Sequence, residues 1–151
     1  MPISKVSTII STIHRKVLKL MGNRFEITVV SDNEGAAFQK IDKAVEEIQR
    51  IEKLLTTYSE DSQTSLINRN AGIMPVRVDK EVFDLIQRSQ RISDVTQGAF
   101  DITYGSADKK LWNFDKNMTS LPDAETAKRS VHLINYKNVL LDKEQGTVFL
   151  K

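Results

Sequence analysis

The sequence predicts an α+β protein in which helices pack on a largely antiparallel β-sheet. Segments with a strand pattern come in pairs near both ends of the chain, around residues 16–30 and 138–151, and helical patterns lie between them. Strands and helices do not alternate strictly, as they would in a doubly wound parallel fold. At 151 residues and 40% apolar content, the chain has the size and composition of one ordinary globular domain.

Charge and cysteine content exclude several classes of site. Basic and acidic residues number 22 and 20 and are interspersed, so we expect no nucleic acid as the main partner. The absence of cysteine rules out disulfides, zinc–thiolate sites and thiol nucleophiles. His14 and His132 are too few and too far apart in the sequence for a histidine metal site. No apolar run approaches the ~20 residues that span a bilayer, so we expect no membrane span.

The first elements are expected to be two strands. Residues 1–15 show no clear period and are expected to be weakly ordered, whereas Lys16–Leu20 and Arg24–Val30 have strand patterns. Gly22-Asn23 would form a hairpin turn between them. Alternatively, one long strand runs through, and Gly22 lets a ligand lie close to the backbone. The pattern alone favours the hairpin.

A long helix should follow and form the main core element. Ser31 and Glu34 have the spacing of a capping box, and the helix is expected to end at Thr56-Thr57. Apolar residues recur at steps of three and four and predict a buried stripe. The stripe consists of Phe38, Ile41, Val45, Ile48, Ile51 and Leu55.

The segment from residue 57 to residue 70 is rich in residues that form turns. One interpretation is a surface loop or a short helix capped by Asp61 or Ser62. The other is that its hydroxyls and amides meet a polar nucleotide. Ser62, Ser65 and Asn68 are spaced at three, so one helical turn would align them on one side.

The middle of the chain predicts an edge strand and a second helix. Pro75 places the short strand Met74–Val78 at a sheet edge or at the start of a strand. Asp79 is expected to cap a helix that runs to about Ser93. Its buried side should contain Val82, Leu85, Ile86 and Ser89.

The run Thr96–Thr103 (TQGAFDIT) has two interpretations. Phe100 and Ile102 alternate with polar residues, which predicts a buried strand whose Asp101 caps a neighbouring turn. Gly98 also permits a close approach to a ligand. After a long stretch in which Trp112 is expected to fix a loop to the core, we predict a helix at 123–131 and a hairpin formed by Asn138–Asp142 and Thr147–Lys151.

Three sequence pieces, in order, resemble the ApbE-type FAD:protein FMN transferases. They are Met21-Gly22 before an aromatic strand, the pattern Y-S-x-D-S-x-x-S-x-I-N at Tyr58–Asn68 with Ala71-Gly72 after it, and T-x-G-A-F-D at Thr96–Asp101. Each piece alone is weak, but three in order across about 80 positions are specific.

The resemblance implies a reaction and a site. In such enzymes FAD is cleaved at its pyrophosphate with Mg²⁺, and FMN passes to a threonine of an acceptor protein. Asp101 is the single candidate metal ligand, and one carboxylate does not make a site, so we assign no metal site. The residues expected to form one wall of the FAD site are Met21, Gly22, Tyr58, Ser62, Asn68, Gly98, Ala99, Phe100 and Asp101.

The resemblance runs from about Lys16 to Lys151, whereas family members continue into a Gly-Gly-x-x-Lys-Gly segment. We therefore expect the N-terminal half of such an enzyme, inactive alone and completed by a C-terminal half or by a second copy. The alternative is a non-catalytic module that binds a nucleotide or a protein. Related proteins are often exported and anchored through a lipid-bearing cysteine. This sequence lacks that cysteine, so it is either not anchored or given without its leader.

Overall fold

A computed structural model describes residues 11–107 and 123–151 of the chain. The described residues fall into two compact units that divide after Thr56, and each unit is described by itself below. The α+β class is confirmed, and every strand pairing in the described residues is antiparallel. The strands form two sheets, one of two strands and one of three, rather than the single sheet that the sequence suggested. Trp112 lies outside the described residues.

The first unit begins with a β-hairpin. Strand β1 (Thr12–Leu20) pairs with β2 (Asn23–Ser31), and Met21 and Gly22 form the turn, with φ angles of 49° and 72°. Positive φ at both positions is typical of a type I′ turn, whose twist matches that of the flanking strands. The predicted hairpin is therefore confirmed, with its turn one residue earlier than expected. β1 also begins before Lys16, so residues 12–15 belong to a strand and not to a weakly ordered terminus.

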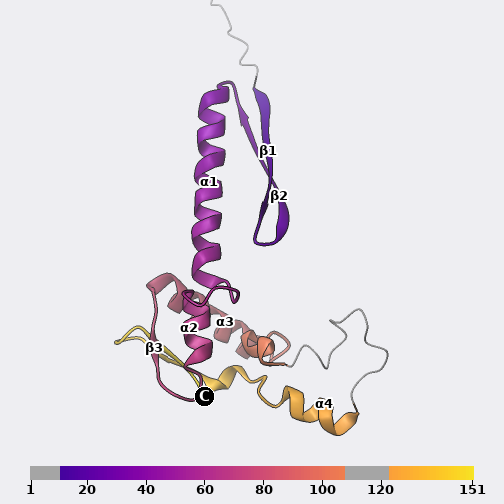
Figure 1. The fold of residues 1–151 in the computed structure, drawn as a ribbon, viewed down its shortest axis with the longest axis vertical. Helices are drawn as coiled ribbons and strands as arrows, with labels where there is room; N and C mark the ends of the chain where they lie inside the picture. The colour runs from indigo at the N-terminus through magenta and orange to yellow at the C-terminus, as the bar shows by residue number, and fades with distance from the viewer. Residues whose placement is uncertain (1–10, 108–122) are drawn as a thin grey trace, which may run out of the picture. The chain divides into compact units, whose positions relative to one another are not determined.

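Helix α1 (Glu34–Leu55) lies along this hairpin (Figure 1). The predicted capping box is wrong, because Ser31 is the last residue of β2 and Asn33 is the N-cap. The Asn33 side chain accepts a hydrogen bond from the Ala36 N–H at 2.9 Å. His14 of β1 packs edge-on against Phe38, with 6.0 Å between ring centroids, and donates from Nε2 to the Ser31 carbonyl. These contacts fix the start of α1 against the hairpin.

The stripe along α1 is less buried than its period predicts. Ala37 and Ile41 are fully buried, whereas Val45, Ile48 and Ile51 are half-buried. Neighbouring strands lie only about 5 Å apart, so a sheet of two strands covers a narrow part of the helix surface. The fully buried apolar residues described in this unit are therefore few, namely Leu20, Ala37 and Ile41.

The second unit contains a three-stranded sheet. Strands β4 (Val139–Asp142) and β5 (Thr147–Leu150) form the predicted hairpin. Strand β3 (Val76–Arg77) pairs with β5 at the sheet edge, as Pro75 suggested, but is shorter than expected. The turn between β4 and β5 is held by the Asp142 carboxylate, which accepts from the Glu144 and Gln145 N–H groups at 2.9 and 3.0 Å.

Helix α3 (Lys80–Val95) supplies much of the core of the second unit. It begins after Asp79 as predicted, but the Asp79 side chain makes no capping hydrogen bond. Its buried apolar side chains are Val82, Phe83 and Ile86, whereas Leu85 is 43% exposed and was wrongly placed in the core. Buried Ser89 and Ser93 donate hydrogen bonds back to carbonyls one turn earlier, which satisfies their hydroxyls.

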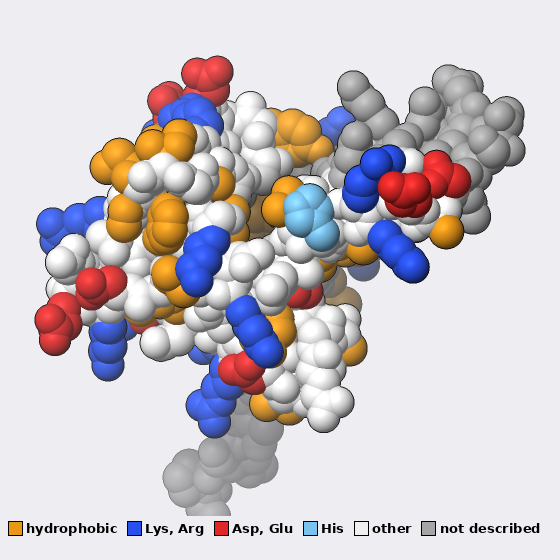
Figure 2. All heavy atoms as spheres, turned by 90° about the horizontal axis from the view of Figure 1, so that it is seen from below, with side chains coloured by type: hydrophobic (Ala, Val, Ile, Leu, Met, Phe, Trp, Pro, Cys, Tyr) orange, Lys and Arg blue, Asp and Glu red, His pale blue; other side chains and the backbone are white. Residues whose placement is uncertain are grey.

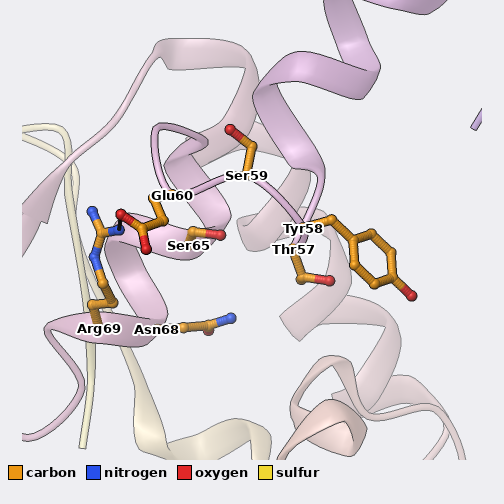
Figure 3. A pocket seen from close by; sticks show the side chains of 7 residues that line it. All are labelled: Thr57, Tyr58, Ser59, Glu60, Ser65, Asn68 and Arg69. Atoms are coloured by element: carbon orange, nitrogen blue, oxygen red, sulfur yellow. Dashed lines mark ion pairs between the residues drawn. The ribbon is translucent and has the colours of Figure 1, made fainter.

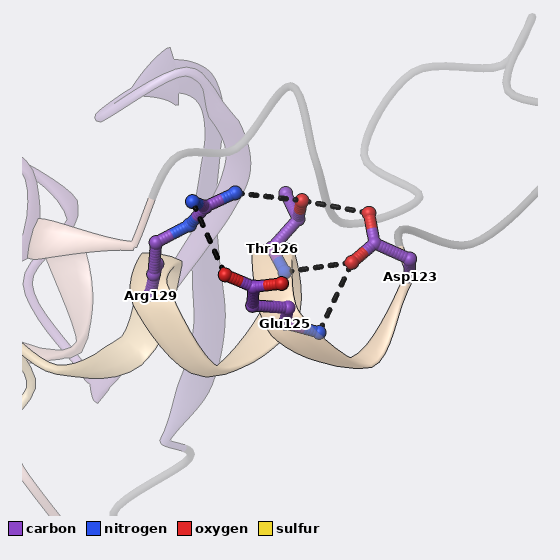
Figure 4. A network of polar contacts seen from close by, with 4 residues as sticks. All are labelled: Asp123, Glu125, Thr126 and Arg129. Atoms are coloured by element: carbon purple, nitrogen blue, oxygen red, sulfur yellow. Dashed lines mark hydrogen bonds and ion pairs between the residues drawn. The ribbon is translucent and has the colours of Figure 1, made fainter.

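Helix α4 (Ala124–Val131) has Asp123 as its N-cap, and the sequence predicted a short helix here (Figure 4). The Asp123 carboxylate accepts from the N–H groups of Glu125 and Thr126 and from the Thr126 hydroxyl, at 3.0, 2.9 and 2.7 Å. These hydrogen bonds, led by those from Thr126, lower the pKa of Asp123 below its usual 3.8. Glu125 and Arg129 form an exposed ion pair at 3.6 Å on the same helix.

Acidic and basic side chains are interspersed over the face drawn in Figure 2, without a large area of one charge. Within residues 11–107 and 123–151, every helix is too short or too polar to cross a lipid bilayer.

Candidate functional site

A pocket of about 290 Å³ lies between the segment after α1 and the short helix α2 (Gln63–Arg69) (Figure 3). All of its lining residues belong to the second unit. They are Thr57, Tyr58, Ser59, Glu60, Ser65, Asn68 and Arg69. Six of these seven side chains are polar or charged without being aromatic, so the pocket suits a polar ligand.

Ser62 starts the helix that forms one side of this pocket. Its hydroxyl accepts a hydrogen bond from the Ser65 N–H at 3.0 Å, and the residue is only 2% exposed. The sequence offered Asp61 or Ser62 as the cap of a short helix here, and Ser62 is the cap. Because it is buried as a cap, Ser62 does not line the pocket, although it orients the helix that does.

Ser65 and Asn68 lie one helical turn apart and both line the pocket, as their spacing predicted. The side chains of Thr57, Ser65 and Asn68 make no hydrogen bond with any other described residue. Two hydroxyls and one amide are therefore available at the pocket to a ligand or to water.

The charged residues of the pocket are Glu60 and Arg69. Arg69 Nη1 lies 4.0 Å from Glu60 Oε2, and the two side chains face each other on one side of the pocket (Figure 3). Tyr58 is on the other side, with its ring turned away from them and 96% of the residue exposed. Arg69 was not among the predicted site residues, although its position four residues after Ser65 on the same helix was a usable signal.

The TQGAFDIT run forms a tight turn after α3 and not a strand. Gln97 and Gly98 have φ angles of 53° and 85°, and the Gly98 N–H donates to the Ser93 carbonyl at 2.8 Å. The Phe100 N–H then donates to the Thr96 hydroxyl at 3.1 Å. Consecutive left-handed residues end a helix and reverse the chain. The strand predicted for Phe100–Thr103 is therefore wrong, and the 3₁₀ helix η1 (Ile102–Ser106) follows instead.

Asp101 caps this 3₁₀ helix, which confirms the structural role considered for it. Its Oδ1 accepts from the N–H and hydroxyl of Thr103 at 2.8 and 2.6 Å. Its Oδ2 accepts from the N–H of Tyr136, in the 3₁₀ helix η3 (Tyr136–Asn138), at 2.9 Å. The Thr103 hydroxyl also accepts from the Asn135 N–H at 2.8 Å. Asp101 thus joins two segments that are distant in the sequence.

Tyr136 lies beside two carboxylates. A hydrogen bond to Asp94 raises the pKa of Tyr136 above its ordinary 10.0, and burial and the charges of Asp94 and Asp101 act in the same direction. Tyr136 is therefore a neutral hydrogen-bonding group near this turn at physiological pH.

Over residues 11–107 and 123–151, no group of three or more His, Asp or Glu side chains lies close enough to hold an ion. Both carboxylate oxygens of Asp101 already accept hydrogen bonds. The volume of the pocket at α2 is at the low end for small-molecule sites.

The predicted FAD-wall residues fall in three places. Tyr58 and Asn68 line the pocket, and Ser62 lies behind it as the cap of α2. Gly98, Ala99, Phe100 and Asp101 form the turn after α3 in the same unit. Met21 and Gly22 form the hairpin turn of the first unit.

Comparisons with known proteins point to one family. The model of the ApbE family matches residues 21–151. An FAD:protein FMN transferase of Klebsiella pneumoniae is 34% identical over 132 residues, which cover 87% of this chain and 40% of that protein. The enzyme of the same name from Treponema pallidum is 29% identical over 106 residues, covering 68% and 29%. The chain thus spans about two fifths of the length of the first of these relatives and a smaller share of the second.

Solved structures agree on the fold. The ApbE protein of Thermotoga maritima superposes with a TM-score of 0.80 at 26% identity, covering 93% of this chain and 45% of that one. The apo form of the flavinyl transferase ApbE of Pseudomonas stutzeri gives a TM-score of 0.73 at 21% identity, covering 93% and 44%. Because its sequence identity is low, this second similarity shows a shared fold and nothing more.

Proposed function

The chain belongs to the ApbE family, and we propose that it supplies one wall of the FAD site of a flavin transferase. The single observation that carries this proposal is the 34% identity, over 87% of the chain, to a protein named FAD:protein FMN transferase. The pocket at α2 supports it, because hydroxyl, amide and guanidinium groups there suit a nucleotide.

The proposed reaction transfers FMN from FAD to a threonine of an acceptor protein. The threonine oxygen forms a bond to the FMN phosphorus, the bond to the AMP phosphate breaks, and the threonine proton is lost to a base. Mg²⁺, when bound, would neutralise the charge that develops on the pyrophosphate. The contribution of this chain is to bind and orient FAD, since positioning supplies much of the rate of such transfers.

Each part of the wall has a proposed role. The exposed ring of Tyr58 offers an aromatic surface on which a flat ring system can stack. Asn68 offers an amide for hydrogen bonds to polar groups of the cofactor. Gly22 and Gly98, with positive φ angles and open space around them, would each let a ligand approach the backbone of its own turn, and Ser62 holds α2 in position.

The rest of the site is proposed to come from residues other than these. The magnesium ligands and most phosphate contacts would lie in a complementing C-terminal half, or in a second copy of the chain. On this proposal the 151-residue chain does not transfer FMN alone.

A chimera tests the proposal directly. Residues 21–151 would replace the matching part of the Klebsiella pneumoniae enzyme, and the chimera would be mixed with FAD, Mg²⁺ and an acceptor protein that contains the target threonine. We expect a fluorescent acceptor band on a denaturing gel, none with the 151-residue chain alone, and a weaker band after Tyr58→Ala or Asn68→Ala.

Arg129→Gln is the control for this chimera, because Arg129 lies on the exposed face of α4 outside the pocket. A folded chimera that neither binds FAD nor labels the acceptor would contradict the proposal and favour a non-catalytic module. A labelled acceptor with the 151-residue chain alone would contradict the need for further residues.

A further inference from the structure

The pocket at α2 contains one cationic and one anionic side chain among its seven lining residues, and these two form an ion pair with each other. Arg69 Nη1 lies 4.0 Å from Glu60 Oε2. The Arg69 side chain is 48% exposed and the Glu60 side chain is 95% exposed. Exposed ion pairs at this distance contribute little free energy, because water screens them and two long side chains must be ordered. The Glu60 carboxylate can therefore leave Arg69 at little cost.

The groups beside Arg69 suit an anion that carries several oxygens. Ser65 and Asn68 lie on the same short helix as Arg69, and Thr57 lies across the pocket from that helix (Figure 3). Their hydroxyl and amide groups have no partner among the described residues. A guanidinium matches the geometry of phosphate oxygens, and neighbouring hydroxyl and amide donors add to that match.

We propose that Arg69 binds a phosphate ester in this pocket and that Glu60 competes with that phosphate for the guanidinium. The ligand class is a nucleotide with a terminal or bridging phosphate. Glu60 lowers the affinity of the pocket for such ligands, because each anion must displace the carboxylate from Arg69. The inference rests on the proposed function only in that FAD carries such phosphates, and its test measures binding and not transfer.

Two sources of phosphate share this chemistry, namely the adenylate and the flavin halves of FAD. The test therefore compares AMP with adenosine and FMN with riboflavin, so that each pair differs by one phosphate. Affinities would be measured by NMR titration of the labelled 151-residue chain at low ionic strength. The pair with the larger phosphate preference identifies the half that binds at Arg69.

The variants give effects of opposite sign. Arg69→Gln should reduce the phosphate preference about twofold to fivefold, the range expected for an exposed charge pair. Glu60→Gln should increase it by a similar factor, and the double variant should resemble Arg69→Gln. Loss of a merely structural contact would not produce an increase in either case.

The matched controls are Arg129→Gln and Glu125→Gln, which make the same charge changes in the exposed ion pair of α4. They should leave the phosphate preference unchanged. The proposal is overturned if neither nucleotide binds more tightly than its nucleoside, if Glu60→Gln fails to raise the preference, or if Glu125→Gln raises it equally. A chimera that transfers FMN but shows no such preference would overturn this inference and leave the proposed function standing.

Discussion

At the scale of single residues, the Asp101 carboxylate joins η1 to the segment that begins η3. It accepts hydrogen bonds from the Thr103 N–H, the Thr103 hydroxyl and the Tyr136 N–H. Asp101→Ala leaves all three donors without this acceptor, and each buried donor left unpaired costs about 1–3 kcal/mol. We expect a loss of at least about 1–3 kcal/mol in the free energy of unfolding of the second unit, measured by urea denaturation.

Asp84→Ala is the control, because among the described residues the Asp84 side chain makes only an exposed ion pair, with Lys80. It should change stability by less than about 0.5 kcal/mol. Equal effects of the two variants would contradict the structural role of Asp101. Asp101→Asn in the active chimera then tests whether the carboxylate also acts on the reaction.

Met21 gives a prediction in which stability and binding move in opposite directions. It adopts φ 49°, a conformation that costs a residue other than glycine about 1–2 kcal/mol, and Asn-Gly is the preferred sequence for this turn. Met21→Asn should therefore raise the stability of the hairpin unit by about 1 kcal/mol while weakening FAD binding to the chimera. Thermal unfolding and FAD titration of the same variant provide both measurements, and unchanged FAD affinity would remove Met21 from the proposed wall.

Some single residues were predictable and others were not. The cap at Ser62 and the capping role of Asp101 followed from side chains that bond to their own backbone. The strand predicted for Phe100–Thr103 was wrong. The alternation of apolar and polar residues there matches the period of a strand, but no strand forms. The left-handed Gln97 and Gly98 and the Asp101 carboxylate instead turn the chain into η1.

At the scale of elements, burial along α1 predicts how much stability two isoleucines contribute, relative to each other. Ile41 is fully buried and Ile48 is half-buried, although the sequence pattern treats them alike. Ile41→Ala should cost about 2–5 kcal/mol, as a fully buried large-to-small change does. Ile48→Ala should cost about half as much or less in the 151-residue chain. Equal losses in urea denaturation would show that the stripe is uniformly buried in solution.

Helix α4 should respond to pH through its cap. The Thr126 and Glu125 hydrogen bonds hold the pKa of Asp123 below 3.8, so the folded state binds the proton less readily than the unfolded state. The stabilisation by Asp123 is therefore fully present above about pH 4 and is lost as the pH falls through the lowered pKa. The protection of the amides of Ala124–Val131, measured relative to the intrinsic exchange rate at each pH, should fall at low pH in the unaltered protein. In Asp123→Asn, whose amide also caps, the change should be smaller, and identical profiles would contradict the role of the carboxylate.

Elements were easier to predict than their ends and faces. The long helix, the second helix, the α4 helix and the C-terminal hairpin all exist, because each has a clear period or turn signal. The cap of α1 was misassigned because Ser31 continues β2, which only strand pairing determines. Leu85 was placed in the core because the helical period does not reveal which side of α3 its neighbours cover.

At the scale of the whole molecule, family and fold class were predictable, whereas the grouping of the site residues was not. Three short motifs in order indicated the family, and the match over residues 21–151 agrees with them. The motifs could not separate Ser62, which is buried as a cap, from Asn68, which lines the pocket. They also gave no sign of the ion pair between Glu60 and Arg69, which depends on how the loop before α2 folds back.

The measurement that tests the central claim most directly is an NMR titration of the labelled 151-residue chain with FAD. If the chain supplies one wall of the site, about half the contacts of a micromolar site remain, and the expected affinity is near millimolar. Shift changes should concentrate at Met21-Gly22, Tyr58–Arg69 and Gly98–Asp101. Shift changes confined to other segments, or none at several times that concentration, would contradict the account. A stoichiometric complex that survives gel filtration would show instead that these residues form a complete FAD site.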